Sequence, residues 1–227
     1  MPSKLVLVGT RSSAGNIPKE MMGNHQSDRK REPPATQRDL DAVLRTTTLL
    51  PWRKPDLTIK TEVSDYNEVY PSIYISSAPF AKSKETLKRV GVTHVLNCAE
   101  GASFMCVDTG QTYYKPSPIV YKGLRAADSF AYDLSQHFDE SCRFIDEALN
   151  ADGKVLVHCL QGWSRSPTIV AAYLMKMKGM SARKALKTIR SKREIGPNSG
   201  FLEILAALDR ELYDQEQTGT QEHKETT

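Results

Sequence analysis

KVLVHCLQGWSRS, residues 154–166, is the stretch that decides the fold of this chain. Its first part, Lys154–His158, is a short and nearly continuous apolar run, which is typical of a strand buried at the centre of a sheet. Its second part is a loop that opens a helix predicted at Ser166–Lys178. A loop that leads from a buried strand into a helix N-terminus presents unpaired backbone N–H groups and the positive end of the helix dipole. The stretch therefore predicts an anion site at the end of a central strand.

Cys159 lies at the mouth of this predicted site. Because N–H donors and a helix N-terminus lower the pKa of a thiol, we expect Cys159 to attack as a thiolate. Arg165 can reach back over the loop and bind two phosphate oxygens with its planar guanidinium. Ser166 is expected to hydrogen-bond the sulfur and help it leave, and His158 to brace the loop rather than act as a base. A structural cysteine beside an ordinary arginine is the alternative, but Cys, Gly162 and Arg-Ser at this spacing favour catalysis.

The rest of the chain supports one ordinary domain with polar flanks. The chain has 227 residues, a formal net charge of +4 and four cysteines, which indicates neither a nucleic-acid-binding surface nor a zinc site. We predict a disordered tail over residues 1–35, a helix and linker over 36–66, the compact domain over 67–213 and a flexible tail over 214–227. No apolar run approaches the length of a membrane span or of a signal-peptide core.

Strands and helices are predicted to alternate along the domain. Helical spacing of apolar residues is clearest in Leu134–Leu149. The alternation predicts an α/β fold, a mixed and mostly parallel central sheet covered by helices on both faces. The predicted strands are Glu68–Ser76 (a strand or hairpin edge), Thr93–Cys98, Ile119–Leu124 and Lys154–His158. The predicted helices are Thr36–Arg45, Ala81–Val90, Leu134–Leu149, Ser166–Lys178, Ala182–Ser191 and Gly200–Tyr213.

The motif over residues 158–166 resembles that of a known family. HCLQGWSRS matches the HCxxGxxRS signature of protein tyrosine phosphatases, and the wider region looks like the VHR-like atypical dual-specificity phosphatases. The resemblance spans about residues 36–213. The stretches that carry it are NEVYPSIYI (67–75), THVLNCAEG (93–101), SFMCVDT (103–109), VLVHC (155–159), SRSPTIVAAYLM (164–175) and REIGPNSGFL (193–202).

The resemblance implies an enzyme that hydrolyses phosphotyrosine and phosphothreonine or phosphoserine in proteins through a phosphocysteine intermediate. It identifies Asp128 as the general acid. In the sequence Asp128 lies after a predicted strand and before a predicted helix, on a loop that could close over phosphate. A solvated loop aspartate is the alternative for Asp128 itself. Asp133, which better fits a helix cap, and Asp139 are the alternative acids.

A second set of residues is expected to bind the substrate. The backbone N–H groups of the loop should surround the phosphate whatever the side chains are: Leu160, Gln161, Gly162, Trp163 and Ser164. The resemblance implies that Arg193 binds a second phosphorylated or acidic group, although a solvent-facing arginine is the alternative. Relatives often have Glu in place of Gln161 and Tyr in place of Trp163, which leaves the substrate preference open. Cys98, Cys106 and Cys142 are expected to be core or surface residues rather than redox partners.

The sequence and the resemblance also predict the partners and the location of this protein. We expect phosphorylated protein substrates, with mitogen-activated protein kinases implied by the family, and no metal, cofactor, nucleic acid or membrane. Cytosol or nucleus is the expected location because thiols stay reduced there. Pairing of two copies is left open. The competing hypotheses are a non-catalytic phosphoprotein-binding module, and a phosphatase that acts on RNA 5′ ends or lipids.

Overall fold

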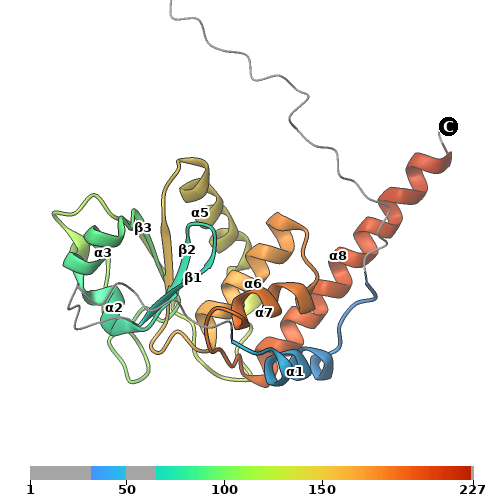
Figure 1. The fold of residues 1–227 in the computed structure, drawn as a ribbon, viewed down its shortest axis with the longest axis horizontal. Helices are drawn as coiled ribbons and strands as arrows, with labels where there is room; N and C mark the ends of the chain where they lie inside the picture. The colour runs from blue at the N-terminus through green and yellow to red at the C-terminus, as the bar shows by residue number, and fades with distance from the viewer. Residues whose placement is uncertain (1–31, 50–64, 226–227) are drawn as a thin grey trace, which may run out of the picture. The chain divides into compact units, whose positions relative to one another are not determined.

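The computed structural model describes residues 32–49 and 65–225, which belong to one compact unit that begins at Arg31 (Figure 1). Most of the predicted N-terminal tail (1–31) and of the predicted linker (50–64) lies outside the described residues. In chain order the elements are α1 (Gln37–Thr46), β1 (Tyr66–Tyr70), β2 (Ile73–Ser76), α2 (Ala78–Lys82), α3 (Lys84–Val90), β3 (His94–Asn97), α4 (Gln111–Tyr114), β4 (Val120–Gly123), η2 (Leu134–His137, a 3₁₀ turn), α5 (Phe138–Asn150), β5 (Val155–His158), α6 (Arg165–Lys178), α7 (Ala182–Arg190) and α8 (Ser199–Glu225).

The strands of the described chain form one mixed sheet in the order β1-β2-β5-β3-β4. β1 pairs antiparallel with β2, and the other pairings, β2 with β5, β5 with β3 and β3 with β4, are all parallel. β5 lies at the centre and every one of its residues is buried. The predicted mixed, mostly parallel sheet is therefore confirmed, with the KVLVH strand in its middle.

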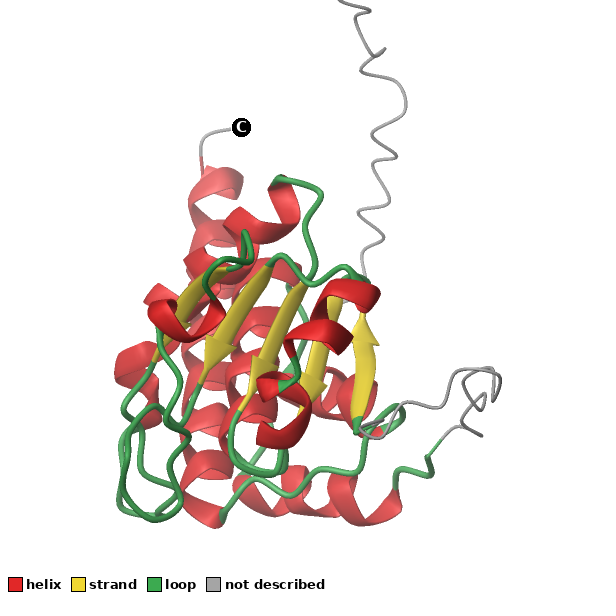
Figure 2. Cartoon of the chain, turned by 90° about the vertical axis from the view of Figure 1, so that its left-hand side faces the viewer, coloured by secondary structure: helices red, strands yellow, loops and turns green. Residues whose placement is uncertain are grey.

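Each face of the sheet is covered by its own set of helices (Figure 2). Because side chains alternate along a strand, Val155 and Val157 of β5 enter the larger apolar cluster, with residues of α1, α5, α6, α7 and α8. Leu156 enters the smaller cluster with Phe80, Leu87 and other residues of the α2–α4 side. This alternation fixes the orientation of β5 and therefore the place where its following loop emerges.

Helix α1 lies in the same compact unit as the domain predicted over 67–213. Thr36 caps the helix in a reciprocal pair with Asp39. Leu40 is fully buried and α1 packs on α7 and α8. The buried carboxylate of Asp209 joins these parts, because it accepts from the Ala35 N–H at 2.9 Å and from the Ala182 N–H at 3.0 Å.

Several helix boundaries differ from those predicted. Helix α8 continues past Tyr213 to Glu225, so the predicted flexible tail is helical over most of its length. Residues 214–218 are exposed, and bonds such as Gln215 Nε2 to Glu211 Oε1 support this part of the helix. The segment predicted as one helix over Ala81–Val90 is two, α2 and α3, which meet at Ser83. The short helix α4 was not predicted.

The loops that follow the parallel strands emerge at one edge of the sheet. β2, β3, β4 and β5 run in the same direction, so their carboxyl ends share that edge. Segments that begin at residues 77, 98, 124 and 159 are thus brought together although they are far apart in the chain. Ligands of open α/β sheets bind at this edge, and the predicted site residues lie there.

Candidate active site

The phosphate loop, residues 159–164, connects β5 to α6 and is held from outside by its carbonyl oxygens. Each carbonyl from residue 160 to 163 accepts a hydrogen bond: from Ala78 N at 2.9 Å, Arg193 Nη2 at 3.0 Å, Arg193 Nε at 3.0 Å and Gly196 N at 2.9 Å, in chain order. Peptide N–H and C=O groups point in opposite directions. The N–H groups of the loop are therefore turned inward, toward Cys159, which is the cradle expected for an oxyanion.

Gly162 is the residue that lets the phosphate loop turn this tightly. Its φ of +67° lies in the left-handed region that L side chains rarely adopt. A Cβ at this position would lie 2.5 Å from the Ser76 carbonyl oxygen and 2.7 Å from Arg193 Nη2. Any side chain at this position would collide with the groups that hold the loop in place. The motif therefore requires glycine here for steric reasons.

Cys159 is 1% exposed at the centre of the loop. Burial by itself would raise the pKa of its thiol. The Ser166 hydroxyl and N–H, the Arg165 charge and the Trp163 N–H oppose this, and the net result is a pKa below the ordinary value. The Ser166 Oγ donates to the Cys159 sulfur at 3.4 Å. This is the arrangement that favours a thiolate nucleophile.

His158 lies at the end of β5 and is fully buried. Burial lowers its pKa to about 4, so the imidazole is neutral at physiological pH. Its Nδ1 lies 3.2 Å from the Cys159 carbonyl oxygen. Because a carbonyl only accepts, Nδ1 carries the proton, and the buried Nε2 has no hydrogen-bond partner. This placement fits the expected bracing of the loop.

Arg165 begins α6 and is 1% exposed. Its Nη1 donates to the Ala126 carbonyl and its Nη2 to the Met105 carbonyl, each at 3.1 Å. The guanidinium thereby joins the phosphate loop to the loops after β4 and after β3. Its Nε lies 3.4 Å from Asp128 Oδ2, but no hydrogen bond forms, and this buried N–H has no other partner. This N–H of the guanidinium is therefore available to donate a hydrogen bond to an incoming oxygen.

Asp128 lies on the acid loop, residues 124–133, which follows β4. Its Oδ1 accepts from Ser164 Oγ at 2.8 Å and from Asn198 Nδ2 at 3.0 Å. These two bonds leave Oδ2 on the side of Arg165, and the Asp128 side chain is 22% exposed. The structure therefore brings Asp128 beside Arg165 and the end of the phosphate loop at the strand edge.

Asn198 is a site residue that the sequence analysis missed. Besides Asp128 it contacts the phosphate loop, since its N–H donates to Ser164 Oγ at 3.3 Å. Its Oδ1 accepts from the Phe201 N–H at the start of α8. An Asn just before a predicted helix is a signal for a cap, but nothing in the sequence connects that cap to an aspartate 70 residues earlier.

Arg193 lies against the phosphate loop. It is 8% exposed. Besides the two carbonyls of the phosphate loop, its guanidinium donates to Asp65 Oδ1 at 2.8 Å and to Asn67 Oδ1 at 2.9 Å. In this structure Arg193 supports the phosphate loop from outside and does not face solvent. Its binding of a second phosphorylated or acidic group stays a prediction.

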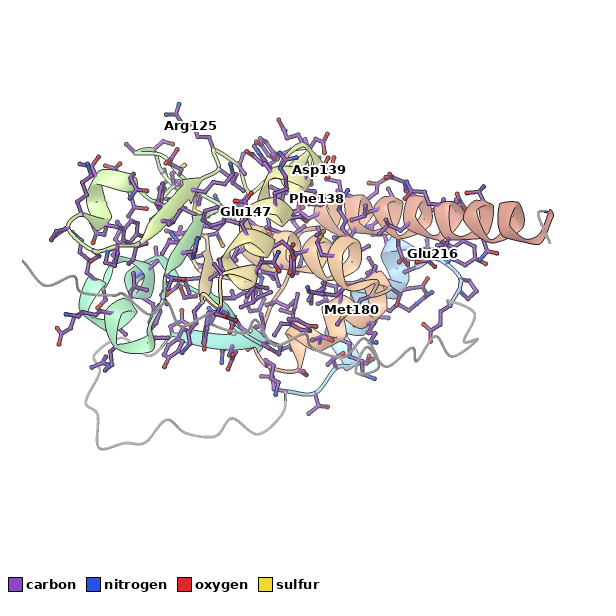
Figure 3. All side chains as sticks on the ribbon, turned by 90° about the horizontal axis from the view of Figure 1, so that it is seen from above. Arg125, Phe138, Asp139, Glu147, Met180 and Glu216 are labelled. Atoms are coloured by element: carbon purple, nitrogen blue, oxygen red, sulfur yellow. The ribbon has the colours of Figure 1, made fainter. Side chains whose placement is uncertain are left out.

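The other candidate acids lie apart from this constellation. Asp133 caps the 3₁₀ turn η2 by accepting from the Ser135 N–H at 3.0 Å, as its sequence position suggested. Asp139 is 74% exposed on α5, where it pairs with Lys176 (Figure 3). All four cysteines are free thiols. Burial raises the pKa of the Cys98 thiol well above its ordinary value and raises that of Cys142 to about 12, so neither is activated as Cys159 is.

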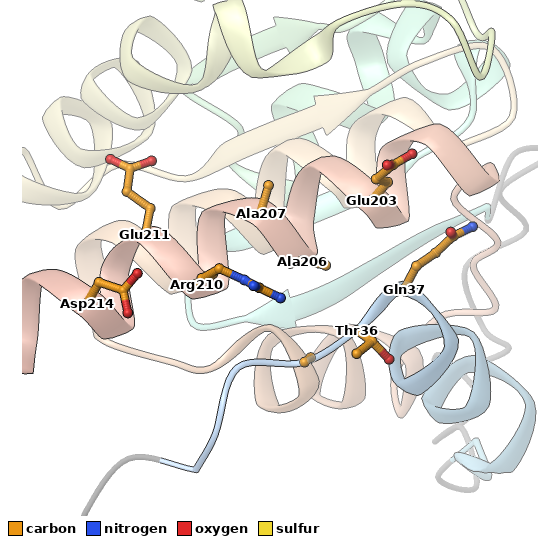
Figure 4. A pocket seen from close by; sticks show the side chains of 9 residues that line it. Thr36, Gln37, Glu203, Ala206, Ala207, Arg210, Glu211 and Asp214 are labelled. Atoms are coloured by element: carbon orange, nitrogen blue, oxygen red, sulfur yellow. The ribbon is translucent and has the colours of Figure 1, made fainter.

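A separate groove runs between the start of α1 and α8 (Figure 4). Its lining consists of alanines, two neutral polar residues and charged residues of both signs: Ala35, Thr36, Gln37, Glu203, Ala206, Ala207, Arg210, Glu211 and Asp214. None of the predicted site residues is among them. Within the described ranges, no His, Cys, Asp and Glu side chains group as a metal site would require. The described helices include none with the length and apolar character to cross a bilayer.

Comparisons with known proteins agree with this geometry. Residues 73–211 match the family model "Dual specificity phosphatase, catalytic domain". Dual specificity protein phosphatase 13B of Mus musculus is 44% identical over 147 residues, which cover 64% of this chain and 73% of that protein. The crystal structure of a human DUSP28 variant has a TM-score of 0.60 and 31% identity, and covers 67% of this chain and 99% of its own. A mouse dual specificity phosphatase complexed with zinc tungstate has a TM-score of 0.60 and 27% identity, over 69% and 94% of the two chains.

Proposed function

This chain belongs to the dual specificity phosphatase family and is a dual-specificity protein phosphatase, and from that premise we propose how its residues carry out the reaction. The observation that carries the proposal is the phosphate loop, whose carbonyls are tied outward around a buried cysteine. A phosphate monoester would bind with its oxygens on the inward N–H groups of residues 160–164 and on Arg165. Leu160, Gln161, Gly162, Trp163 and Ser164 act through their backbone.

In the first step the Cys159 thiolate attacks phosphorus, and the bond from phosphorus to the ester oxygen breaks. Asp128, protonated on Oδ2, gives its proton to the departing oxygen, so that a neutral alcohol or phenol leaves. Phosphate would take the place of Asp128 at Arg165 Nε, which has no hydrogen-bond partner now. Oδ2 is then left to face the leaving oxygen, while Ser164 and Asn198 continue to hold Oδ1.

In the second step water attacks the phosphocysteine. Asp128, now a carboxylate, takes a proton from that water. The oxygen of the water bonds to phosphorus as the bond from sulfur to phosphorus breaks. The sulfur departs as a thiolate, which the hydroxyl of Ser166 stabilises by its hydrogen bond. His158 keeps its role in holding the loop through the Cys159 carbonyl. Arg193 supports the same loop from outside.

The direct test is phosphate release from a peptide that carries phosphotyrosine and phosphothreonine, with the native protein, Cys159→Ser and Asp128→Asn. We expect turnover of both residues by the native protein, none by Cys159→Ser and a partial loss in Asp128→Asn. Tight phosphopeptide binding without any release by the reduced native protein would overturn the proposed mechanism in favour of a non-catalytic phosphoprotein-binding module.

The substrates, location and assembly of this protein are inferred from the resemblance and from the free thiols. We propose that the substrates are phosphorylated proteins of the cytosol or nucleus, mitogen-activated protein kinases among them, and that neither nucleic acid nor membrane is involved. A dephosphorylation assay on a doubly phosphorylated kinase tests the first statement, and fractionation of cells tests the second. The pairing of two copies stays a prediction for sedimentation measurements.

A further inference from the structure

Exposed apolar side chains are concentrated around Cys159. Among the described residues, the exposed large apolar side chains are Leu49, Phe104, Met105, Val120, Phe130, Trp163 and Met177. Four of these, Phe104 (93% exposed), Met105 (41%), Phe130 (75%) and Trp163 (42%), lie on the three loops that border the site. Single exposed apolar residues are ordinary, but a group of them on one surface indicates an interaction site.

The loops that carry these side chains are fastened to the catalytic residues. Met105 accepts from Arg165 Nη2 through its carbonyl, so the segment with Phe104 lies at the same guanidinium that binds phosphate. Trp163 belongs to the phosphate loop, and its indole lies against the backbone of Gly196. The Phe130 backbone lies so close to Gly200 that a Cβ there would be 2.0 Å from its carbonyl oxygen. The four side chains are thus placed by the architecture of the active site.

The stretches directly around the four apolar side chains contain little charge. In the segments 102–105, 126–132 and 159–164, the sequence has one charged side chain, that of Asp128. Asp128 is already engaged by Ser164 and Asn198. Near the two ends of the acid loop lie Arg125, which points away from the ribbon (Figure 3) and pairs with Glu100 at 3.7 Å, and Asp133, which caps η2. Between these two flanking charges the loop offers few charged groups to a substrate.

We propose that Phe104, Met105, Phe130 and Trp163 form an apolar rim that binds apolar side chains on either side of the phosphorylated residue. The inference rests on the proposed function, because the occupant of the rim is the polypeptide whose phosphate occupies the loop below it. It assigns the substrate class: phosphoproteins whose modified residue stands between aliphatic or aromatic neighbours. Burial of these neighbours on the rim removes apolar surface of both partners from water.

The test compares three phosphotyrosine peptides of equal length that differ only beside the phosphotyrosine. One has Leu and Phe there, one has Ser at both places, and one has Glu at both places. We expect kcat/KM for the apolar peptide to exceed that for the Ser peptide by about tenfold, with the Glu peptide no better than the Ser peptide. In Phe104→Ser and Phe130→Ser the ratio of the apolar to the Ser peptide should fall toward one.

Met177→Ser is the matched control. Met177 is also an exposed apolar residue, at 43% exposure, and it lies near the far end of α6 from the phosphate loop. The preference ratio of this variant should equal that of the native protein. All three substituted side chains are exposed, so the variants are expected to fold, and phenyl phosphate, which has no flanking residues, provides the rate to which each variant is normalised.

The outcomes separate the two proposals. Equal rates on the three peptides, or a preference for the Glu peptide, would overturn the apolar rim while turnover itself upholds the phosphatase mechanism. A phosphoinositide in vesicles that is hydrolysed at a higher kcat/KM than any peptide would also overturn it, since the exposed aromatics would then serve a lipid surface. Failure of the native protein to hydrolyse even phenyl phosphate would overturn both.

Discussion

The phosphate loop and the acid loop both lie at the carboxyl edge of the sheet, but they are held by different kinds of bond. Consecutive carbonyls of the phosphate loop are anchored to their surroundings, and its cysteine is 1% exposed. Asp128 of the acid loop is held through one carboxylate oxygen by two side chains, and its side chain is 22% exposed. The candidate nucleophile is therefore positioned by the backbone of its loop, which both backbone donors and the Arg193 side chain hold from outside. The candidate acid is positioned through its own carboxylate by two side chains.

The largest expected effect is at the nucleophile. Cys159→Ser should reduce phosphate release from every substrate by about 10⁴-fold or more, because a serine hydroxyl in the same cradle does not ionise at neutral pH. The fold should be retained, and the variant should still bind phosphopeptides in a titration. Residual turnover within tenfold of the native rate would show that another residue attacks phosphorus.

Arg165→Lys comes next. It keeps the charge but loses the planar fork and the bonds that join the phosphate loop to the Ala126 and Met105 carbonyls. We expect a loss of about 10³-fold in kcat/KM on all phosphate esters, including phenyl phosphate. A loss restricted to peptides would instead mean that Arg165 contacts the polypeptide rather than the phosphate.

Asp128→Asn should cost about 10²-fold, and unlike the first two changes its effect should depend on the leaving group. A tyrosine or threonine oxygen needs a proton as it departs, whereas an acidic nitrophenol does not. The ratio of rates on phosphotyrosine peptide and on p-nitrophenyl phosphate measures this dependence. If both substrates lost the same factor, Asp128 would not be the general acid.

Ser166→Ala tests how the phosphate loop keeps the Cys159 thiol ionised. The Ser166 hydroxyl helps to hold the pKa of Cys159 below its ordinary value, so its removal should raise that pKa. Since the thiolate is the reactive form, kcat/KM falls as pH drops below this pKa, and a higher pKa moves the acidic limb of the profile to higher pH. At a fixed pH on that limb, kcat/KM should fall by about tenfold for every pH unit by which the limb moves. The pH dependence of Cys159 alkylation by iodoacetate measures the new pKa without turnover.

The smallest expected effect is at Asn198. Asn198→Ala removes one of the two side-chain donors to Asp128 and should lower peptide turnover by about fivefold. Because Asn198 acts through Asp128, the loss should disappear when it is combined with Asp128→Asn. Additive losses in the double variant would show that the effect comes from the lost cap of α8 instead.

The geometry of the phosphate loop could be predicted because it is local. Cys159, Gly162, Arg165 and Ser166 lie within eight positions between a strand and a helix, and the backbone of such a turn dictates where their groups point. The acid required the resemblance, since nothing between Asp128 and Cys159 in the sequence fixes the distance that separates them in space. The bonds of Arg193 to the phosphate loop could not be predicted, because a sequence does not reveal whether an arginine turns inward to carbonyls or outward to solvent.

By itself the sequence determined most of the elements and the candidate nucleophile: a buried strand, a glycine turn and a helix N-terminus give a cysteine in an N–H cradle by local geometry. The end of α8 and the membership of α1 in the domain needed the structure, because extension along a helix axis and the Asp209 bonds do not show in apolar periodicity. The meeting of Asp128, Asn198 and the four exposed apolar side chains with Cys159 was decided only by the tertiary structure. The physical reason is that parallel strands in the order β2-β5-β3-β4 bring the loops at their carboxyl ends to one edge, and the order of strands in a sheet is not written in any one of them.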